Sequence, residues 1–276
     1  MIAGPQPPPG SRPVVVVPTY NEVASLPGLL GGLLALRAPP DVLVVDDNSP
    51  DGTADMVRGH PDFGRRIFLL SRPSKMGLGS AYRDAFQWAI LQGYTAAVEI
   101  DADLSHDPND VPRLIAALDA GADMAIGSRY SEGVNVIHWP LRRLLLSIGA
   151  GLYARLFTGL RLADPTSGFK AIRREVIERL DWGRIAVDGY GFQIALHFYA
   201  QRRGFRLVEV PIVFTERRSG CSKLSRRIAF EAFGLVLKLA VVRMRDALLG
   251  RPRGMEGSGS QAQARGEGEP PAIRHQ

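Results

Sequence analysis

Cysteine is nearly absent from this sequence. Cys221 is the single cysteine among 276 residues, so no internal disulfide can form and nothing points to an oxidising compartment. No obvious base stands near Cys221 in the sequence, and we interpret it as a packing residue rather than a nucleophile. The scarcity of cysteine therefore excludes a fold held together by disulfides.

Long uncharged hydrophobic runs are also absent. The most apolar stretches, residues 144–157 and 230–249, are interrupted by charged side chains such as Arg155 and Lys238, whereas a membrane-spanning helix needs about 20 predominantly apolar residues. Residues 1–13 are rich in proline and lack the charged and apolar regions of a secretory signal. We therefore predict a soluble or peripheral protein.

The glycine-rich phosphate loops of common nucleotide-binding folds are missing too. Gly77 and Gly79 occur without the third glycine of the dinucleotide-binding fingerprint, and no P-loop with its Gly-Lys-Ser/Thr spacing is present. Any bound nucleotide must therefore be held by polar groups at strand ends and by a metal ion.

Positive charge, by contrast, is in excess. The 34 Lys and Arg residues outnumber the 28 Asp and Glu residues, which gives a formal net charge of +6 and a pI near 9.8. This charge favours binding to polyanions such as nucleotides, nucleic acid or an anionic membrane surface. The sequence carries no recognised nucleic-acid-binding module, and its basic residues lie among acidic clusters, so we predict no nucleic-acid partner.

Short apolar runs alternate with amphipathic segments along the first half of the chain. This alternation indicates an α/β fold with a mostly parallel sheet flanked by helices. Strands are predicted at 14–17, 42–45, 67–70, 96–100 and 124–126, and helices at 26–36, 81–90 and 109–120. Residues 13–249 are assigned to one domain, with disordered segments at 1–12 and 250–276.

The alternation weakens after residue 130. Amphipathic helices with basic residues are predicted at 141–160 and 230–249, and a further helix at 191–202. Residues 163–169 read as a loop. The run at 207–214 is predicted to be a strand at a sheet edge or bulge, because it contains a proline, Pro211.

The predicted strand at 96–100 ends in two carboxylates one residue apart, Asp101 and Asp103. Ligands collect outside the carboxyl ends of strands in open α/β sheets, and carboxylate oxygens suit Mg²⁺ or Mn²⁺ better than zinc. Because Mg²⁺ is usually shared between one or two carboxylates and substrate phosphates, the pair indicates a nucleoside diphosphate ligand. A turn or helix-cap role is the alternative, and it better fits Asp107, which stands before Pro108.

Polar residues follow other predicted strands as well. Glu22 and Asp47 could hydrogen-bond the ribose or base of a nucleotide, or could cap a helix and close a turn. Arg129 directly follows the strand at 124–126, and Asp164 is a candidate base or orienting group in a turn-like sequence. Acidic clusters with scattered arginines predict transfer from a sugar nucleotide, with a metal ion neutralising the departing diphosphate.

Several basic residues and two histidines complete the candidates. His106 and His138 lack the spacing of metal ligands, and we interpret them as packing or capping residues. Four basic residues could form a cationic cluster: Arg129, Arg143, Arg217 and Lys223.

Taken together, six motifs resemble those of family 2 glycosyltransferases of the dolichol-phosphate (polyprenyl-phosphate) mannose synthase type. They occur in the family's order and cover about residues 13–249. The motifs are Pro18-Thr19-Tyr20-Asn21-Glu22, Asp46-Asp47-Asn48-Ser49-Pro50-Asp51-Gly52-Thr53, Asp101-Ala102-Asp103-Leu104-Ser105-His106, Gly127-Ser128-Arg129-Tyr130, Asp164-Pro165-Thr166-Ser167-Gly168-Phe169 and Ser222-Lys223.

The resemblance implies a GT-A fold and site residues in four roles. The metal, Mg²⁺ or Mn²⁺, would be held by Asp101 and Asp103, and the acceptor phosphate by Arg143 and Ser147. Residues implied as catalytic are Asp103, Arg129 and Asp164. Those implied to contact the donor are Pro18, Tyr20, Glu22, Val45, Asp47, Asp101, Ala102, Asp103, Arg129, Arg217 and Lys223. Ser105 stands where relatives often carry Gln, so no third metal contact is expected from that side chain.

The function implied is inverting transfer of mannose from GDP-mannose to a polyprenyl phosphate. The enzyme would act peripherally at the cytoplasmic face of a membrane, through the helices at 141–160 and 230–249 or a separate membrane anchor protein. Two alternatives stay open: a polyprenyl-phosphate glucosyltransferase that uses UDP-glucose, and a catalytically silent sugar-nucleotide or membrane-partner module. The intact Asp101, Asp103 and Arg129 argue against the silent module.

Overall fold

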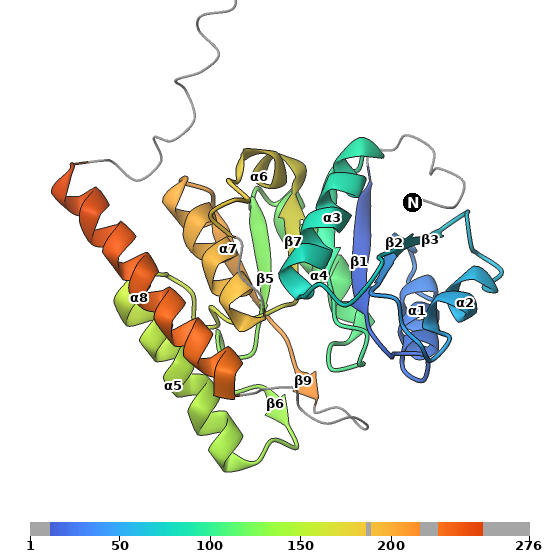
Figure 1. The fold of residues 1–276 in the computed structure, drawn as a ribbon, viewed down its shortest axis with the longest axis horizontal. Helices are drawn as coiled ribbons and strands as arrows, with labels where there is room; N and C mark the ends of the chain where they lie inside the picture. Colours follow the sequence, from blue (N-terminus) through green and yellow to red (C-terminus); the bar gives the residue numbers. More distant parts are fainter. Residues whose placement is uncertain (1–11, 186–188, 216–225, 251–276) are drawn as a thin grey trace, which may run out of the picture.

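The computed structural model describes residues 12–185, 189–215 and 226–250, and their main element is a seven-stranded sheet with helices on both faces (Figure 1). The strands lie in the order β3-β2-β1-β4-β7-β5-β8, and β7 alone among them runs antiparallel to its neighbours. Their bounds are β1 Pro13–Thr19, β2 Asp41–Asp46, β3 Ile67–Ser71, β4 Ala96–Glu99, β5 Met124–Ser128, β7 Lys170–Arg173 and β8 Leu207–Pro211. The mostly parallel sheet predicted from the sequence is confirmed.

The valine run of β1 shows how the core is divided between the two faces of the sheet. Val14 and Val16 pack into one layer, whereas Val15 and Val17 pack into the other, and all four are fully buried. Strands buried on both faces carry such continuous apolar runs. Helices α3 (Leu78–Leu91), α6 (Arg174–Arg179) and α7 (Tyr190–Arg202) cover the first face, and α1 (Leu26–Leu34), α2 (Thr53–Arg58) and α4 (Val111–Asp119) cover the second.

The order of the strands reverses next to β1. From β1 the chain moves to β2 and β3 on one side and then returns to β4 on the other. In sheets of this kind, ligands bind outside the carboxyl ends of the strands at this reversal point. The segments that leave β1 and β4 there begin at Tyr20 and Ile100, so the candidate carboxylates of residues 101 and 103 lie at the expected edge.

Strand β7 was not predicted, and its direction explains part of the site. It is four residues long and begins and ends with the charged residues Lys170 and Arg173, which hides its apolar pattern. Because β7 is antiparallel to β4 and pairs Lys170 with Glu99, the loop that precedes it arrives at the carboxyl edge of the parallel strands. The loop at 163–169 therefore reaches the same edge as Asp101.

Smaller differences concern the ends of elements. The strand predicted at 14–17 continues through Pro18 to Thr19. The strand predicted at 207–214 ends at Pro211, on the edge of the sheet, and Phe214–Thr215 (β9) pairs instead with Val136–Ile137 (β6). The helix predicted at 109–120 is a 3₁₀ turn, Pro108–Asp110, followed by α4, and Asp107 caps it by accepting a hydrogen bond from the Asn109 backbone N–H at 2.9 Å. The capping interpretation of Asp107 is confirmed.

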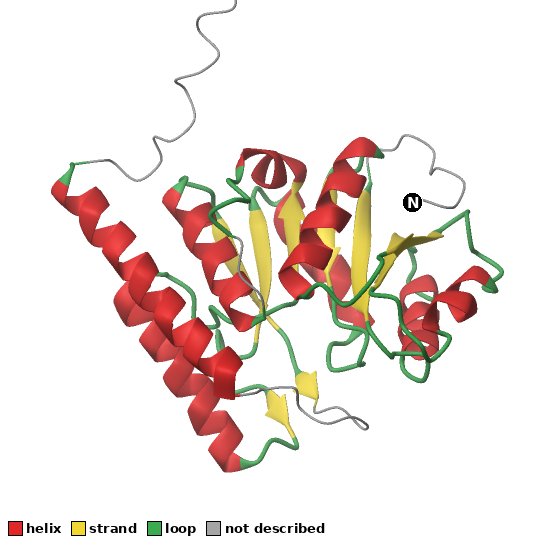
Figure 2. Cartoon of the chain, viewed as in Figure 1, coloured by secondary structure: helices red, strands yellow, loops and turns green. Residues whose placement is uncertain are grey.

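Two long helices, α5 (Leu141–Thr158) and α8 (Arg226–Leu248), pack against each other at one end of the sheet (Figure 2). The rings of Tyr153 and Phe233 stack with centroids 4.7 Å apart, and Arg243 donates to the last carbonyls of α5. Gly159 ends α5 at φ 74°, and a Cβ there would lie 2.7 Å from Arg243. In the part of the chain that the structure describes, no helix has the length and apolarity needed to cross a bilayer.

Candidate active site

The loops after β1 and β2 are tied together by aspartates. Asp46 accepts hydrogen bonds from Thr19 Oγ1 at 3.0 Å and from the backbone and hydroxyl of Ser49 at 3.0 and 2.6 Å. Asp51 accepts from the Val23 backbone N–H at 3.1 Å. These hydrogen bonds occupy both carboxylates, so Asp46 and Asp51 hold the turns that follow β1 and β2.

Asp47 differs from Asp46 because it faces an arginine. Its carboxylate forms an ion pair with Arg72 at 2.7 Å and accepts from the Met76 backbone N–H at 3.3 Å. Burial raises the pKa of Asp47, and the charge of Arg72 only partly offsets this effect. Arg72 also pairs with Asp84 at 3.1 Å. Arg72 was not predicted as a site residue, although it directly follows a strand, β3, and a place after a strand is what marked Arg129 as a candidate.

Four other residues implied to contact the donor lie in or just after the carboxyl ends of β1 and β2. Pro18 and Val45 are register partners in β1 and β2. Tyr20 follows β1, and the ammonium group of Lys75 lies 4.2 Å from the centroid of its ring. Glu22 accepts a hydrogen bond from Ser25 Oγ at 2.8 Å just before α1, but its side chain accepts none from a backbone N–H of that helix, so its predicted capping role is not observed.

The loop after β4 carries Asp101, Ala102 and Asp103. Asp103 accepts a hydrogen bond from the Ser105 backbone N–H at 3.0 Å. Leu104 has φ 61°, a conformation that bulky residues rarely adopt and that often marks a functional site. A Cβ at Gly168 would lie 4.0 Å from Asp101 Oδ2, so the loop before β7 passes close to this carboxylate.

The chemistry of this loop fits a divalent metal ion shared with a ligand. Asp101 and Asp103 are both half-buried and provide hard oxygen atoms from one turn. Among the described residues there is no group of three or more His, Cys, Asp or Glu side chains placed to hold a metal. Two carboxylates alone match the way Mg²⁺ is held when substrate phosphates complete its shell.

His106 packs beneath this loop. Its ring lies 4.8 Å from the Phe169 ring and 5.1 Å from the Phe214 ring, and the residue is 5% exposed. Burial lowers the pKa of His106 to about 4, although nearby Asp103 opposes the shift. His106 is therefore neutral at physiological pH, and its predicted packing role is confirmed.

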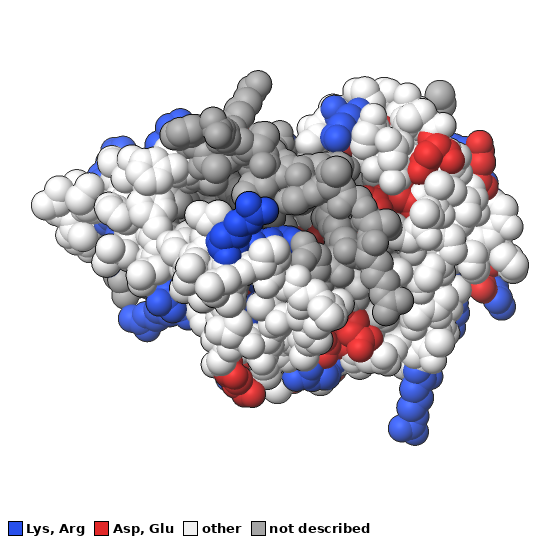
Figure 3. Space-filling view, turned by 90° about the horizontal axis from the view of Figure 1, so that it is seen from below, with Lys and Arg blue, Asp and Glu red and all other residues white. Residues whose placement is uncertain are grey.

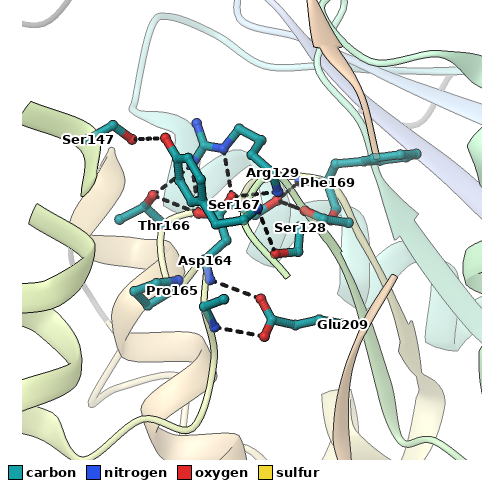
Figure 4. Close-up of polar contacts among 12 residues, drawn as sticks. Ser128, Arg129, Ser147, Asp164, Pro165, Thr166, Ser167, Phe169 and Glu209 are labelled. Atoms are coloured by element: carbon teal, nitrogen blue, oxygen red, sulfur yellow. Dashed lines mark hydrogen bonds and ion pairs between the residues drawn. The ribbon is translucent and has the colours of Figure 1, made fainter. Parts of the chain in front are cut away.

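Arg129 and Asp164 form a buried ion pair at the centre of the site (Figure 4). Arg129 Nε and Nη2 each donate to the carboxylate at 2.6 Å, and the Arg129 backbone N–H donates at 3.1 Å. Thr166 accepts from Arg129 Nη2 at 2.8 Å and donates to Asp164 at 3.1 Å. Burial would raise the pKa of Asp164, but the charge and hydrogen bonds of Arg129 lower it overall. A carboxylate held in this state orients Arg129 and is a poor proton acceptor.

Glu209 of β8 holds the loop that presents Asp164. Its two carboxylate oxygens accept hydrogen bonds from the backbone N–H groups of Ala163 at 2.7 Å and Asp164 at 2.9 Å (Figure 4). Glu209 was not predicted from the sequence to be a site residue. An acidic residue within a predicted strand was the available signal.

Replacing Glu209 by Ala is expected to lower the free energy of unfolding by about 2–3 kcal/mol, because two partly buried N–H groups lose a charged acceptor. Chemical denaturation measures this change. Glu178→Ala is the control, since Glu178 forms an exposed pair with Arg174 one helical turn away, and pairs of this kind contribute about 0.3–0.5 kcal/mol. Equal losses in the two variants would contradict the role assigned to Glu209.

The two residues implied to bind the acceptor phosphate lie on α5, near Arg129. Tyr130 donates a hydrogen bond from its hydroxyl to Ser147 Oγ at 2.8 Å. The guanidinium carbon of Arg143 lies 4.3 Å from the centroid of the Trp139 ring, and that of Arg129 lies 5.6 Å from the same centroid. The structure therefore brings the acceptor candidates to the ion pair. Three residues singled out in the sequence, Arg217, Cys221 and Lys223, lie outside the described residues.

A second buried charge pair lies where β4 ends, next to the loop that carries Asp101 and Asp103. This pair was not predicted from the sequence. Lys170 of β7 pairs with Glu99 of β4 at 3.2 Å, and Gln193 donates to Glu99 at 3.0 Å and accepts from Lys170. Burial raises the pKa of Glu99 and lowers the pKa of Lys170. Glu99 stands two residues before Asp101, so this network fixes the end of the strand from which the loop departs.

Comparisons with known proteins converge on one family. The sequence profile of Glycosyl transferase family 2 matches residues 14–181. A protein named polyprenol monophosphomannose synthase, from Mycolicibacterium smegmatis, is 47% identical over 221 residues, which cover 79% of this chain and 82% of that protein. An undecaprenyl-phosphate mannosyltransferase from Micrococcus luteus is 44% identical over 221 residues, with coverage of 80% and 90%.

A solved structure of glucosyl-3-phosphoglycerate synthase from Mycobacterium tuberculosis, in complex with Mn²⁺, UDP and phosphoglyceric acid, has a similar fold. It aligns with a TM-score of 0.61 at 20% identity and covers 84% of this chain and 79% of that one. This likeness confirms the GT-A type of fold.

Proposed function

Because the chain belongs to glycosyl transferase family 2, we propose that it catalyses metal-dependent, inverting transfer of mannose from GDP-mannose to a polyprenyl monophosphate. The observation that carries the proposal is the gathering of Asp101, Asp103, the Arg129–Asp164 pair and Arg143 at one edge of the sheet. The names of the two relatives, both polyprenyl-phosphate mannosyl enzymes, support the choice of sugar and acceptor.

The donor occupies the reversal point of the sheet in this proposal. Its nucleoside lies against Tyr20 and Asp47, and its diphosphate lies at Asp101 and Asp103. A bound Mg²⁺ or Mn²⁺, held by those two carboxylates, would supply positive charge to stabilise the departing diphosphate. The complex of the fold neighbour with Mn²⁺ and UDP supports this arrangement.

The acceptor phosphate must be brought close to the donor, but it does not need to be deprotonated by the enzyme. A lipid monophosphate is already ionised at neutral pH, so its oxygen can attack the anomeric carbon without a general base. The bond from that carbon to the diphosphate oxygen breaks with its electron pair, GDP leaves, and a single displacement inverts the configuration. The difficulty is to bring two anions together, which calls for positive charge from Arg143 and Arg129. Asp164, with its lowered pKa, orients Arg129.

An exposed apolar surface supports the choice of a lipid acceptor. Helices α5 and α8 expose large apolar side chains, defined here as the α5/α8 face: Leu145, Leu152, Leu156, Phe233, Val241 and Met244. Seen from below, the end of the molecule that carries these helices is mostly white, with Lys and Arg along its edges (Figure 3). Apolar residues bordered by basic ones are the pattern of helices that lie in a membrane interface. We place this face against the cytoplasmic side of the membrane.

Replacing Leu152 and Val241 together by Glu is expected to lower binding to vesicles of anionic phospholipid by tenfold or more, because two exposed apolar contacts become charged. Flotation of the purified chain with such vesicles measures the bound fraction. Leu91→Glu is the matched control, since Leu91 is 77% exposed on α3, outside the α5/α8 face. Unchanged binding by the double variant would point instead to a separate anchor protein.

The direct test of the proposed function is a transfer assay with the full chain. Radiolabelled GDP-mannose and, separately, UDP-glucose are incubated with a short polyprenyl phosphate and Mg²⁺ or Mn²⁺, with and without EDTA. We expect labelled lipid from GDP-mannose only, and none when EDTA is present. Labelling from UDP-glucose only would agree with the proposed site but contradict GDP-mannose as the donor. No labelling from either donor would overturn the proposed function.

A further inference from the structure

One aromatic side chain contacts both arginines that serve the two substrates. The guanidinium carbon of Arg143 lies 4.3 Å from the centroid of the Trp139 ring, and that of Arg129 lies 5.6 Å from it. Neither the resemblance nor the comparisons give Trp139 a role. The ring is therefore shared by an arginine of the donor side and an arginine of the acceptor side.

The fold holds this ring from several directions. Phe214 of β9 packs edge-on against Trp139, with centroids 5.3 Å apart and planes at 77°, and β9 is itself paired with β6. His138 has φ 62°, which turns the chain sharply just before the indole, and Pro140 just after it is the N-cap of α5. The two-stranded sheet and the turn thus fix Trp139 relative to the start of α5.

The physical consequence concerns Arg143. Two guanidinium groups repel each other, whereas the face of an indole attracts both, and tryptophan is the best side chain for this contact. Arg129 is already fixed by its ion pair with Asp164. A ring that contacts both groups therefore sets the position of the Arg143 guanidinium relative to that of Arg129. Arg143 lies in the first turn of α5, which begins two residues earlier at Leu141.

We propose that Trp139 is a positioning residue for the acceptor: its ring holds the Arg143 guanidinium at a set separation from Arg129, so that the acceptor phosphate is received beside the donor. This inference rests on the proposed function. The Tyr130–Ser147 hydrogen bond ties α5 to the residue after Arg129 and supports the same geometry.

The test compares Trp139→Leu with Trp139→Phe in the full chain. Trp139→Leu removes the aromatic face and is expected to raise the KM for polyprenyl phosphate by about tenfold, while the KM for GDP-mannose changes by less than about twofold. Trp139→Phe keeps an aromatic face and is expected to stay within about threefold of the wild type. Wild-type acceptor KM in Trp139→Leu would overturn the inference.

A control for purely structural loss is Trp182→Leu. Trp182 is half-buried and packs on the core residue Phe86, with centroids 5.4 Å apart, and it takes no part in the arginine contacts described above. Its loss is expected to lower the Tm without raising the KM for the acceptor. If the KM values of Trp139→Leu and Trp182→Leu rose equally, the effect would be one of stability and the inference would fail.

A double-mutant cycle shows whether Trp139 acts through Arg143. Arg143→Gln alone is expected to raise the acceptor KM by about thirtyfold, and adding Trp139→Leu should increase it by less than about twofold more. Arg142→Gln, one position away and exposed, should leave it unchanged. Fully multiplicative effects of the two substitutions would overturn the inference alone, whereas absence of mannosyl transfer by the wild type would overturn the proposed function with it.

Discussion

Replacing Asp103 by Asn is expected to lower kcat for mannosyl transfer by about 10³-fold, or about 4 kcal/mol of transition-state stabilisation. The substitution keeps the size of the side chain and its capacity to accept the Ser105 hydrogen bond, but it removes the charge that a divalent metal requires. Initial rates at saturating donor and acceptor measure the change. The metal concentration needed for half-maximal activity is expected to rise in the same variant.

The matched control for this prediction is Asp107→Asn, four residues further along the chain. Asp107 is exposed and caps the 3₁₀ turn at Pro108–Asp110, and Asn is as good a cap as Asp. We expect its kcat to stay within about twofold of the wild type. Near-normal turnover by Asp103→Asn would show that this carboxylate does not hold the metal.

Replacing Arg129 by Lys is expected to lower the free energy of unfolding by about 3–5 kcal/mol and to abolish measurable transfer. Lysine cannot reproduce the forked contact with Asp164, whose side chain is fully buried, so a buried carboxylate is left without its two-point partner. For a chain of this size, the loss corresponds to a fall in Tm of roughly 10 °C. Differential scanning calorimetry and the transfer assay measure the two effects.

An exposed ion pair provides the comparison for Arg129. Arg184 pairs with Asp181 at 3.0 Å, and both side chains are about half exposed, so Arg184→Lys is expected to change stability by less than about 0.5 kcal/mol. If Arg129→Lys were equally mild, the ion pair with Asp164 would not organise the site.

The stability supplied by Asp164 also has an expected pH dependence. Its pKa in the folded protein lies below the ordinary value of 3.8, so the folded state binds this proton less readily than the unfolded state does. The stabilisation is therefore complete above about pH 5 and is lost as the pH falls through 3.8 towards the folded pKa. The stability difference between the wild type and Asp164→Asn should accordingly be constant from pH 5 to 8.

The residues that the sequence made visible are those with strong local patterns. The valines of β1 and β2 form apolar runs that only a buried strand explains, and Asp101 and Asp103 follow such a run directly. The capping role of Asp107 could be read from the proline that follows it. Each of these inferences needs only a few neighbouring residues.

The contacts that the sequence did not reveal join distant segments. Arg129 and Asp164 were each named as candidates, but they lie 35 positions apart, and their pairing depends on β7, whose charged ends conceal a strand. Glu209 accepts hydrogen bonds from backbone N–H groups, and Trp139 contacts two arginines through its ring. No short sequence motif indicates either kind of contact. The pairing of β6 with β9, which brings Phe214 to Trp139, depends on a register that sequence periodicity does not specify.

The structure of the lipid product tests the central claim most directly. The full chain is incubated with GDP-α-mannose, a short polyprenyl phosphate and Mg²⁺, and the purified product is examined by NMR for the sugar, its linkage to phosphorus and its anomeric configuration. We expect a β-linked mannosyl phosphate, as a single displacement by the lipid phosphate requires. An α-linked product, or free mannose with no sugar on the lipid, would contradict the account.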